Sequence, residues 1–257
     1  MDFIVIPMVA GLASLLTFFS GFGLGTLLTP VFAIFFPVEL AIGLTAIVHF
    51  LNGLFKLSLV GRYADKNILI RFGLPAIVSA ALGAWVLSKV SDLPALHSYF
   101  INEHQFHILP LKLILGLLIA VFTLFELIPK LRNLEINFRY LSLGGFISGF
   151  FGGLSGHQGA LRAAFLARAG LSKEQFVATG TVIALMIDIS RITTYSKHLS
   201  LQSIQDHTLL LSLATFFAFL GAYFGNKLLK KVTMKGVQTF VSISLFILAV
   251  ALSLGII

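Results

Sequence analysis

Polar residues that could do chemistry gather within one apolar stretch, residues 149–191. They are His157, Gln158, Arg162, Asp188 and Arg191, and a run of glycines interrupts the stretch just before the histidine. In hydrocarbon a charged side chain costs at least about 2.5–3.5 kcal/mol on insertion scales, so each such residue marks a candidate functional site. Irregular backbone persists at that depth only where protein buries it or where it lines a cavity. The stretch therefore predicts a broken helix with polar groups at the break.

Arg162 follows this break by about one and a half helical turns. A helix N-terminus presents unpaired N–H groups and a partial positive charge. A guanidinium adds a planar pair of donors that fits carboxylate, sulfonate or sulfite oxygens. We therefore predict a small-anion site after the break, formed by Gly156, His157, Gln158, Gly159 and Arg162.

Asp188 and Arg191 are three residues apart and can pair along one helix. Such an internal pair is either structural or, through Asp188, part of a proton path. Alternatively Arg162 pairs with Asp188 across the bundle, and Arg191 is then the cation that binds the anion. The sequence has no nucleotide-binding motif, so energy would come from an ion gradient. Protons are the expected ion, carried by Asp188, His49 or His157.

A second set of polar residues lies in the segment 40–60. They recur at spacings of four, three and four, and so share one face of a helix: Thr45, His49, Asn52 and Lys56. Thr181 occupies a comparable face in the segment 175–196. Either Thr45, Asn52 and Thr181 line a substrate pathway, or they only join neighbouring helices by hydrogen bonds. For His49 the functional role in the pathway is favoured.

The composition indicates an integral membrane protein. The 257 residues are 58% hydrophobic and 11% charged, against about 25% charged in globular proteins. The apolar runs are long and do not alternate with polar residues, which favours helices over a barrel. The net charge is +8, but the basic residues flank apolar runs, which points to the bilayer and not to nucleic acid. Without cysteine, disulfides and thiolate metal sites are excluded, and we expect no cofactor and no metal.

The apolar runs predict ten membrane segments. A straight membrane-spanning helix needs about 20 residues. The segments are 3–20, 22–36, 40–60, 67–88, 108–128, 140–155, 157–170, 175–196, 207–228 and 236–256. The pairs 3–20 with 22–36 and 140–155 with 157–170 are short and meet at glycine clusters. Each pair is either two tilted short spans or one re-entrant hairpin.

The two halves of the chain resemble each other at offsets of 134 to 138 residues. The glycine turn with Gly23 and Gly25 matches the turn that ends at Gly159, and the sequence around Gly83 matches that around Gly221. Internal symmetry of this kind marks secondary transporters. We predict an all-α membrane protein of about 8–10 segments in two inverted repeats of five, each with a glycine-broken helix pair. The parts are residues 1–128, a cytoplasmic linker 129–139, and residues 140–257.

Basic residues predict the orientation. One set of loops carries twelve Lys and Arg residues and the opposite set carries three. Because the richer side is cytoplasmic, both termini are expected outside a multi-pass protein of the cell membrane. The longest polar insertion, 93–110, is then outside. His104 and His107 within it could share a metal ion on a helix, although a surface segment with aromatic anchors is the favoured reading.

The chain resembles the TauE/SafE family of membrane transporters, known as sulfite exporters. The resemblance rests on the glycine turn of each half followed by a short apolar helix, on Ala-x-Gly-x-Thr at 41–45 and Ala-Thr-Gly-Thr at 178–181, and on Leu-Gly-Ala-x-x-x-x-Lys late in both halves. It covers nearly the whole chain. It implies export or uptake of small anions, often sulfur-containing ones.

The function expected from the sequence is ion-coupled secondary transport of a small anion by alternating access. One alternative is an intramembrane enzyme acting on a lipid or small molecule with His49 or His157 as base, although no nucleophile or metal set accompanies either histidine. Another is a membrane assembly partner without transport activity, although its soluble loops are short.

Overall fold

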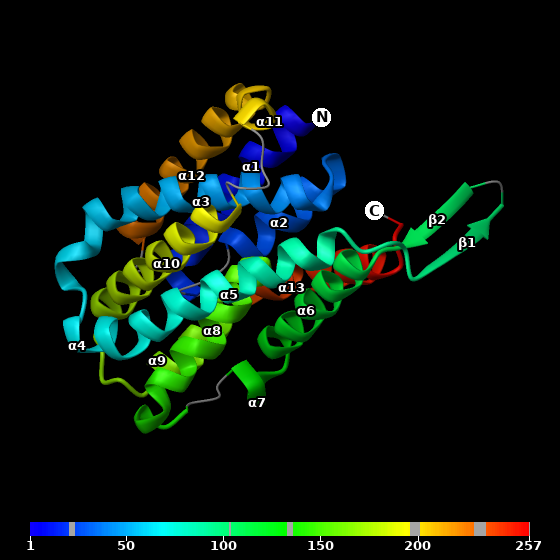
Figure 1. Cartoon of the computed structure of the whole chain (residues 1–257). Helices are drawn as coiled ribbons and strands as arrows, with labels where there is room; N and C mark the ends of the chain where they lie inside the picture. Colours follow the sequence, from blue (N-terminus) through cyan, green and yellow to red (C-terminus); the bar gives the residue numbers. More distant parts are fainter. Residues whose placement is uncertain (21–23, 103, 133–135, 196–200, 229–234, 257) are drawn as a thin grey trace.

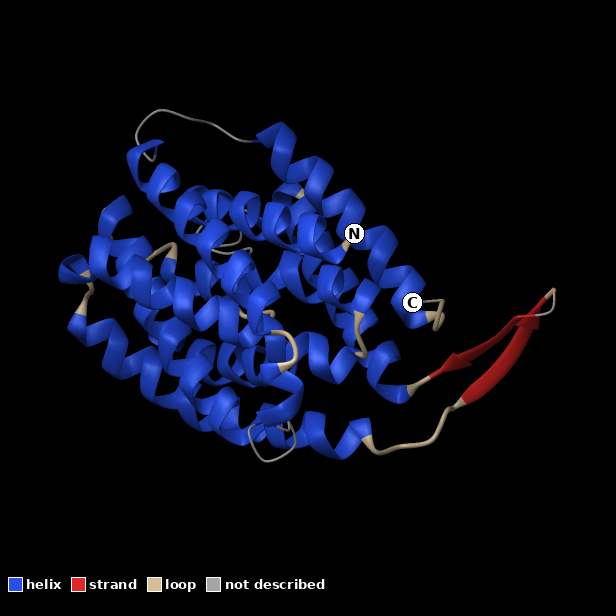
Figure 2. Cartoon of the chain, turned by 90° about the horizontal axis from the view of Figure 1, so that it is seen from above, coloured by secondary structure: helices blue, strands red, loops and turns tan. Residues whose placement is uncertain are grey.

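The computed structural model describes residues 1–20, 24–102, 104–132, 136–195, 201–228 and 235–256. Helices dominate these residues (Figure 2). In the first half they are α1 (Asp2–Ser20), α2 (Leu24–Phe35), α3 (Val38–Val60), α4 (Lys66–Ile68), α5 (Leu74–Ser91), α6 (Pro110–Leu127) and α7 (Pro129–Arg132). A short 3-10 helix, η1 (Gly61–Tyr63), follows α3, and a π-helical turn, η2 (Leu69–Gly73), joins α4 to α5.

The second half begins with a 3-10 turn, η3 (Phe138–Tyr140). Its helices are α8 (Leu141–Ser155), α9 (Gly159–Leu166), α10 (Lys173–Tyr195), α11 (Leu201–Gln205), α12 (Thr208–Leu228) and α13 (Lys235–Ser253). The predicted break between the segments 140–155 and 157–170 is confirmed as the break between α8 and α9. The corresponding turn at residues 21–23, with Gly23, lies outside the described residues.

The insertion after α5 is a β-hairpin, which the expectation of an all-helical protein missed. Strands β1 (His97–Ile101) and β2 (His104–Ile108) pair antiparallel, and Asn102 adopts a positive φ of 54° at the turn. The proposed metal pair of His104 and His107 on a helix is therefore wrong: three positions apart in a strand, these side chains face opposite sides. His107 Nδ1 lies instead 2.8 Å from Ser98 Oγ. The hairpin extends away from the helices beside the C-terminus (Figure 1).

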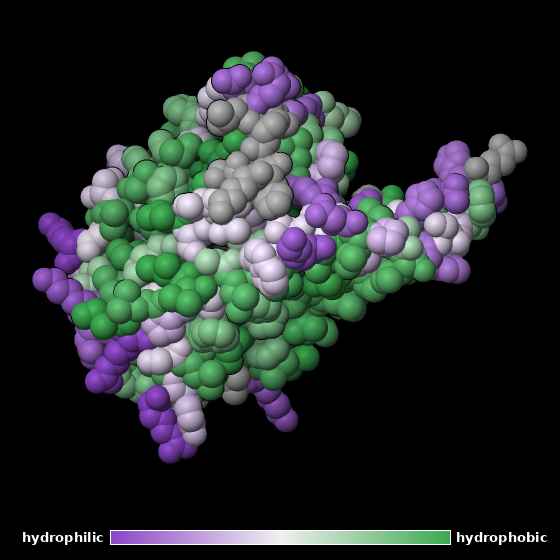
Figure 3. Space-filling model, in the orientation of Figure 1, coloured by the Kyte–Doolittle hydropathy of each residue, from purple (hydrophilic) through white to green (hydrophobic). Residues whose placement is uncertain are grey.

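Four helices of the described residues are long and apolar enough to cross a membrane: Val38–Tyr63, Lys66–Ser91, Lys173–Tyr195 and Thr208–Leu228. On α5 the exposed apolar side chains recur every three or four residues: Leu74, Val78, Leu82 and Trp85. The opposite face of α5 is buried and carries small residues. Apolar surface covers much of the visible helices, while hydrophilic residues gather at the edges and on the hairpin (Figure 3). Outward apolar faces of this kind suit contact with lipid.

The most extensive helix contacts join the two halves of the chain. α1 packs on α12, α5 on α8, α3 on α10, and α6 on α13. Two of these contacts use the matched sequences of the halves: Gly83 on α5 faces the backbone of α8, and Gly221 on α12 faces the backbone of α1. A Cβ would lie 2.1 Å from the Phe150 carbonyl oxygen at Gly83 and 2.0 Å from the Gly11 carbonyl oxygen at Gly221. Small residues let helix backbones approach in lipid, where dispersion and not water exclusion drives packing.

The α5–α8 contact is close along much of its length. Gly145, Gly149 and Gly153 form a stripe with a period of four on α8. A Cβ at these positions would lie 2.1, 2.3 and 2.0 Å from carbonyl oxygens of α5 and of the turn before it. The stripe holds the end of α8, and hence the break after it, against α5.

Gly153→Ala should therefore lower the thermal stability of the detergent-purified protein, because its methyl group would press on the Ala80 carbonyl oxygen at 2.0 Å. Gly11→Ala on α1 is the graded comparison, since its nearest atom is the Phe217 carbonyl oxygen at 3.2 Å. Core overpacking typically costs about 1–3 kcal/mol. A lower melting temperature for Gly11→Ala than for Gly153→Ala would contradict this packing.

Candidate functional site

The break between α8 and α9 is a left-handed turn at Gly156. Its φ is 79°, and its N–H donates to the Gly152 carbonyl oxygen at 2.9 Å, so it caps α8. Glycine is the residue that adopts this conformation without steric cost. A side chain here would also displace Arg191, because a Cβ at Gly156 would lie 2.7 Å from Arg191 Nη1. The chain resumes as a helix at Gly159, with Gln158 at its N-cap position.

The start of α2 meets this turn. A Cβ at Gly25 would lie 3.2 Å from the Gly156 carbonyl oxygen and 3.6 Å from Cδ2 of His49 on α3. Two short helices, α2 and α9, therefore begin close to one another beside the middle of α3. Helix N-termini carry partial positive charge, so two of them facing one space favour an anion there.

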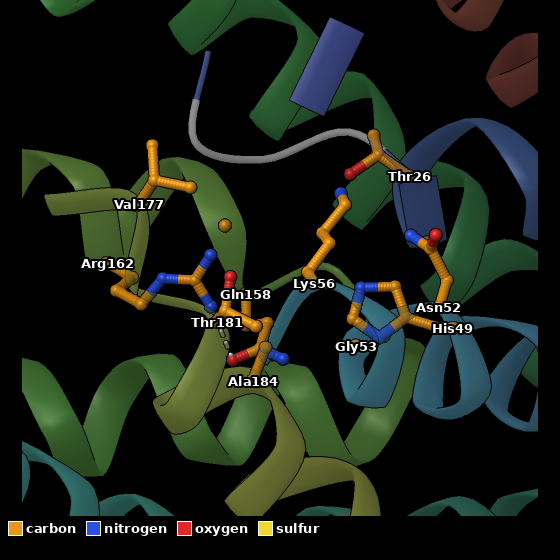
Figure 4. A pocket seen from close by; sticks show the side chains of 13 residues that line it. Thr26, His49, Asn52, Gly53, Lys56, Gln158, Arg162, Val177, Thr181 and Ala184 are labelled. Atoms are coloured by element: carbon orange, nitrogen blue, oxygen red, sulfur yellow. Dashed lines mark hydrogen bonds between the residues drawn. The ribbon is translucent and has the colours of Figure 1, made fainter. Parts of the chain in front are cut away.

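A cavity lies at this meeting point. Its lining comes from α2, α3, the α8–α9 turn, α9 and α10, and consists of Gly25, Thr26, His49, Asn52, Gly53, Lys56, Gly156, Gln158, Gly159, Arg162, Val177, Thr181 and Ala184 (Figure 4). Its volume of about 40 Å³ is room for about three water molecules at roughly 10–15 Å³ each. The space suits a compact polar ligand better than a lipid chain.

The charges that line the cavity are positive. Lys56 and Arg162 are 4% and 5% exposed, and their side chains reach the cavity from different sides (Figure 4). His49 supplies a third basic group, and the described lining contains no Asp or Glu. Arg162 Nη1 donates to Gln158 Oε1 at 3.3 Å. Its guanidinium also lies over Gly180 of α10, where a Cβ would be 3.3 Å from Nε, so a glycine on α10 leaves room for it.

Behind the cavity His49 joins a buried ion pair. Its Nδ1 lies 2.5 Å from Asp188 Oδ2, while Asp188 Oδ1 accepts from Arg191 Nε and Nη2 at 2.9 Å each. The Asp188 side chain is fully buried, that of Arg191 is 1% exposed, and that of His49 is 17% exposed. Because a buried carboxylate needs charge and hydrogen bonds to offset its desolvation, these contacts fix all three side chains. The predicted pairing of Asp188 with Arg191 along the helix is confirmed.

The family model for the sulfite exporter TauE/SafE matches residues 6–252 of this chain. The chain belongs to the TauE/SafE family. No curated protein and no solved structure shows a significant match. This TauE/SafE protein is thus a multi-pass membrane protein of a transporter family, whose members are described as carrying sulfite or related anions.

Most residues expected at the site of the TauE/SafE chain line one cavity. These are Gly25, His49, Asn52, Gly156, Gln158, Gly159, Arg162 and Thr181. The polar residues of the stripe on α3 differ in their surroundings. Asn52 lines the cavity, and its Oδ1 also accepts from Ser14 Oγ of α1 at 3.0 Å. Thr45 is buried and does not line the cavity.

Three other expected site residues lie outside the cavity lining. Asp188 and Arg191 are behind it, and His157 is 2% exposed in the turn. The His157 ring lies parallel to that of Phe122, with centroids 6.3 Å apart, and its Nδ1 is 3.0 Å from the Ser155 carbonyl oxygen. In the TauE/SafE structure His157 therefore shapes the turn without facing the cavity.

Lys56 was not among the residues predicted to bind the anion, although the polar stripe that contains it was predicted. The signal was its position four residues after Asn52, on the face that carries His49. Thr26, Gly53, Val177 and Ala184 were also missed. These are small or apolar residues, and no pattern within their own segments separates them from other packing positions.

Proposed function

We propose that this protein is a secondary transporter that binds one small anion between Arg162 and Lys56. The cavity carries the proposal: two buried cationic side chains and two helix N-termini surround about 40 Å³ without a lining carboxylate. An anion in this space would meet basic side chains from α3 and α9 together with the partial positive charge of the helix N-termini. The small volume favours a compact oxyanion such as sulfite over a lipid substrate.

The arrangement of the helices supports movement of the anion by alternating access between two inverted repeats. If residues 1–128 and 140–257 are related by a two-fold axis in the membrane plane, each contact between two helices should have a counterpart between the two helices that the axis relates to them. The contact of α1 with α12 then corresponds to that of α8 with α5, while α3–α10 and α6–α13 lie on the axis. Binding at the repeat interface, beside broken helices, is typical of such transporters.

Proton coupling is proposed for His49 and Asp188. Imidazole is the side chain that ordinarily changes charge between pH 5 and 8, and His49 both lines the cavity and contacts the buried Asp188. Asp188 orients the ring, while His49 exchanges protons with the cavity. Arg191 holds the Asp188 carboxylate in place by direct hydrogen bonds.

Transport by purified protein in liposomes tests the function. We expect saturable uptake of radiolabelled sulfite above that of protein-free liposomes, competition by other compact oxyanions such as sulfate and thiosulfate, and weak competition by long-chain sulfonates. Inhibition should increase as the competitor becomes smaller, because the cavity limits size. Folded protein that takes up none of these anions would contradict the proposal.

The proposed orientation places the loop before α5 in the cytoplasm and the hairpin outside. The native chain has no cysteine, so single cysteines report position directly. Asn67→Cys in α4 and Ala95→Cys before β1 both replace exposed residues. In intact cells Ala95→Cys should react with a membrane-impermeant thiol reagent, and Asn67→Cys should react only after permeabilisation. The reverse labelling pattern would invert the orientation.

A further inference from the structure

His49 connects the cavity with the buried ion pair through the two edges of one ring. Its Nδ1 is occupied by Asp188 at 2.5 Å. The opposite edge carries Nε2 beside Cδ2, and Cδ2 lies 3.6 Å from the Cβ position of the cavity residue Gly25. Figure 4 shows the ring among the side chains that line the cavity. A proton added at Nε2 would therefore place a positive charge at the cavity wall, while Nδ1–H keeps its bond to Asp188.

The charged groups near His49 decide what this proton does. Those on the elements packed around it are Lys56 on α3, Asp188 and Arg191 on α10, Arg162 on α9 and His157 in the α8–α9 turn. Asp188 is already bonded to Arg191, so a second positive charge on the ring is only partly offset. Toward the cavity the neighbours are Lys56 and Arg162, both basic. An anion held by these basic side chains would add a negative charge beside Nε2 of His49, and a proton at Nε2 would then be attracted to it.

We infer that His49 takes up a proton when the anion binds, so that the anion and the proton travel across the membrane in the same direction. The physical basis is linkage: if a bound anion favours protonated His49, protonated His49 must favour the bound anion by the same factor. The species that moves most readily is then the anion together with its proton. This inference rests on the proposed function and adds the direction of coupling and the residue that sets it.

His49→Asn is the informative variant. The asparagine amide nitrogen can occupy the place of Nδ1 and donate to Asp188, while the group that titrates is lost. His97→Asn in the exposed strand β1 is the matched control. Proton uptake on binding is measured by calorimetry of sulfite binding in buffers of different ionisation enthalpy. Sulfite exchanges a proton itself near neutral pH, so the result is the difference between wild type and variant, in which that contribution cancels.

At pH 7 we expect wild type and His97→Asn to take up a substantial fraction of one proton more per sulfite bound than His49→Asn. The affinity of His49→Asn for sulfite should also lose the rise that the wild type shows as pH falls from 8 to 6. In liposomes an inward proton gradient should drive sulfite accumulation by wild type and by His97→Asn, and not by His49→Asn.

Equal proton uptake by wild type and His49→Asn would overturn the assignment to His49 and move it to another group such as Lys56. Accumulation driven by an outward proton gradient would overturn the common direction of transport. In both cases sulfite still binds and the proposed function stands. Absence of sulfite binding by folded wild-type protein would instead defeat the proposed function for this anion, and with it the inference.

Discussion

Arg162→Ala should lower the affinity for the transported anion roughly 10- to 100-fold, since a hydrogen bond to a charged group contributes about 1.5–3 kcal/mol. The guanidinium is 5% exposed and reaches the cavity over Gly180. Its loss leaves Lys56 as the principal cation opposite the helix N-termini. Arg162→Lys keeps the charge without the planar pair of donors, so it should bind between wild type and alanine. Affinity is read by calorimetry with sulfite.

Arg168→Ala provides the control for Arg162→Ala. Arg168 is an exposed residue that follows the end of α9 and does not line the cavity. We expect its affinity to equal that of wild type. Folded Arg162→Ala that binds sulfite as tightly as Arg168→Ala would remove Arg162 from the site and leave Lys56 and His49 as its candidate cations.

Asp188→Asn should lower the free energy of unfolding by about 3–5 kcal/mol, because breaking a buried ion pair leaves the partner charge uncompensated. The partner is Arg191, 1% exposed and bonded to Asp188 through Nε and Nη2. Its Nη1 has no hydrogen-bond partner among the described residues. The substitution also weakens the contact that orients His49. Thermal unfolding in detergent should occur well below the wild-type temperature.

The double variant Asp188→Asn/Arg191→Gln separates charge from packing. Removing the orphaned cation should restore part of the stability, so the two changes should be non-additive. Asp206→Asn, at an exposed position after α11, should behave as wild type. Full additivity, or an Asp188→Asn protein as stable as Asp206→Asn, would contradict the view that this pair supports the fold around the cavity.

Local chemistry explains why the helices were predictable. The segments predicted at 40–60, 140–155 and 175–196 appear as Val38–Val60, Leu141–Ser155 and Lys173–Tyr195, because length and apolarity define a helix in lipid. The break at Gly156 was visible for the same reason, since glycine at a left-handed cap is a property of one position. The hairpin was missed because a search for long apolar runs ignores short strands, although Asn102 between two aromatic-rich segments was a turn signal.

The sequence by itself determined that this is a helical membrane protein with a glycine break next to an intramembrane arginine, because these follow from residue type and order along single segments. Only the tertiary structure decided that Asp188 bonds to His49, 139 residues away, and that Lys56 faces the same cavity as Arg162. Helix periodicity gives the face on which each residue lies but not the helix that packs on that face. The packing of α3 on α10, and of α2 on the Gly156 turn, turned separate polar stripes into one positively charged site.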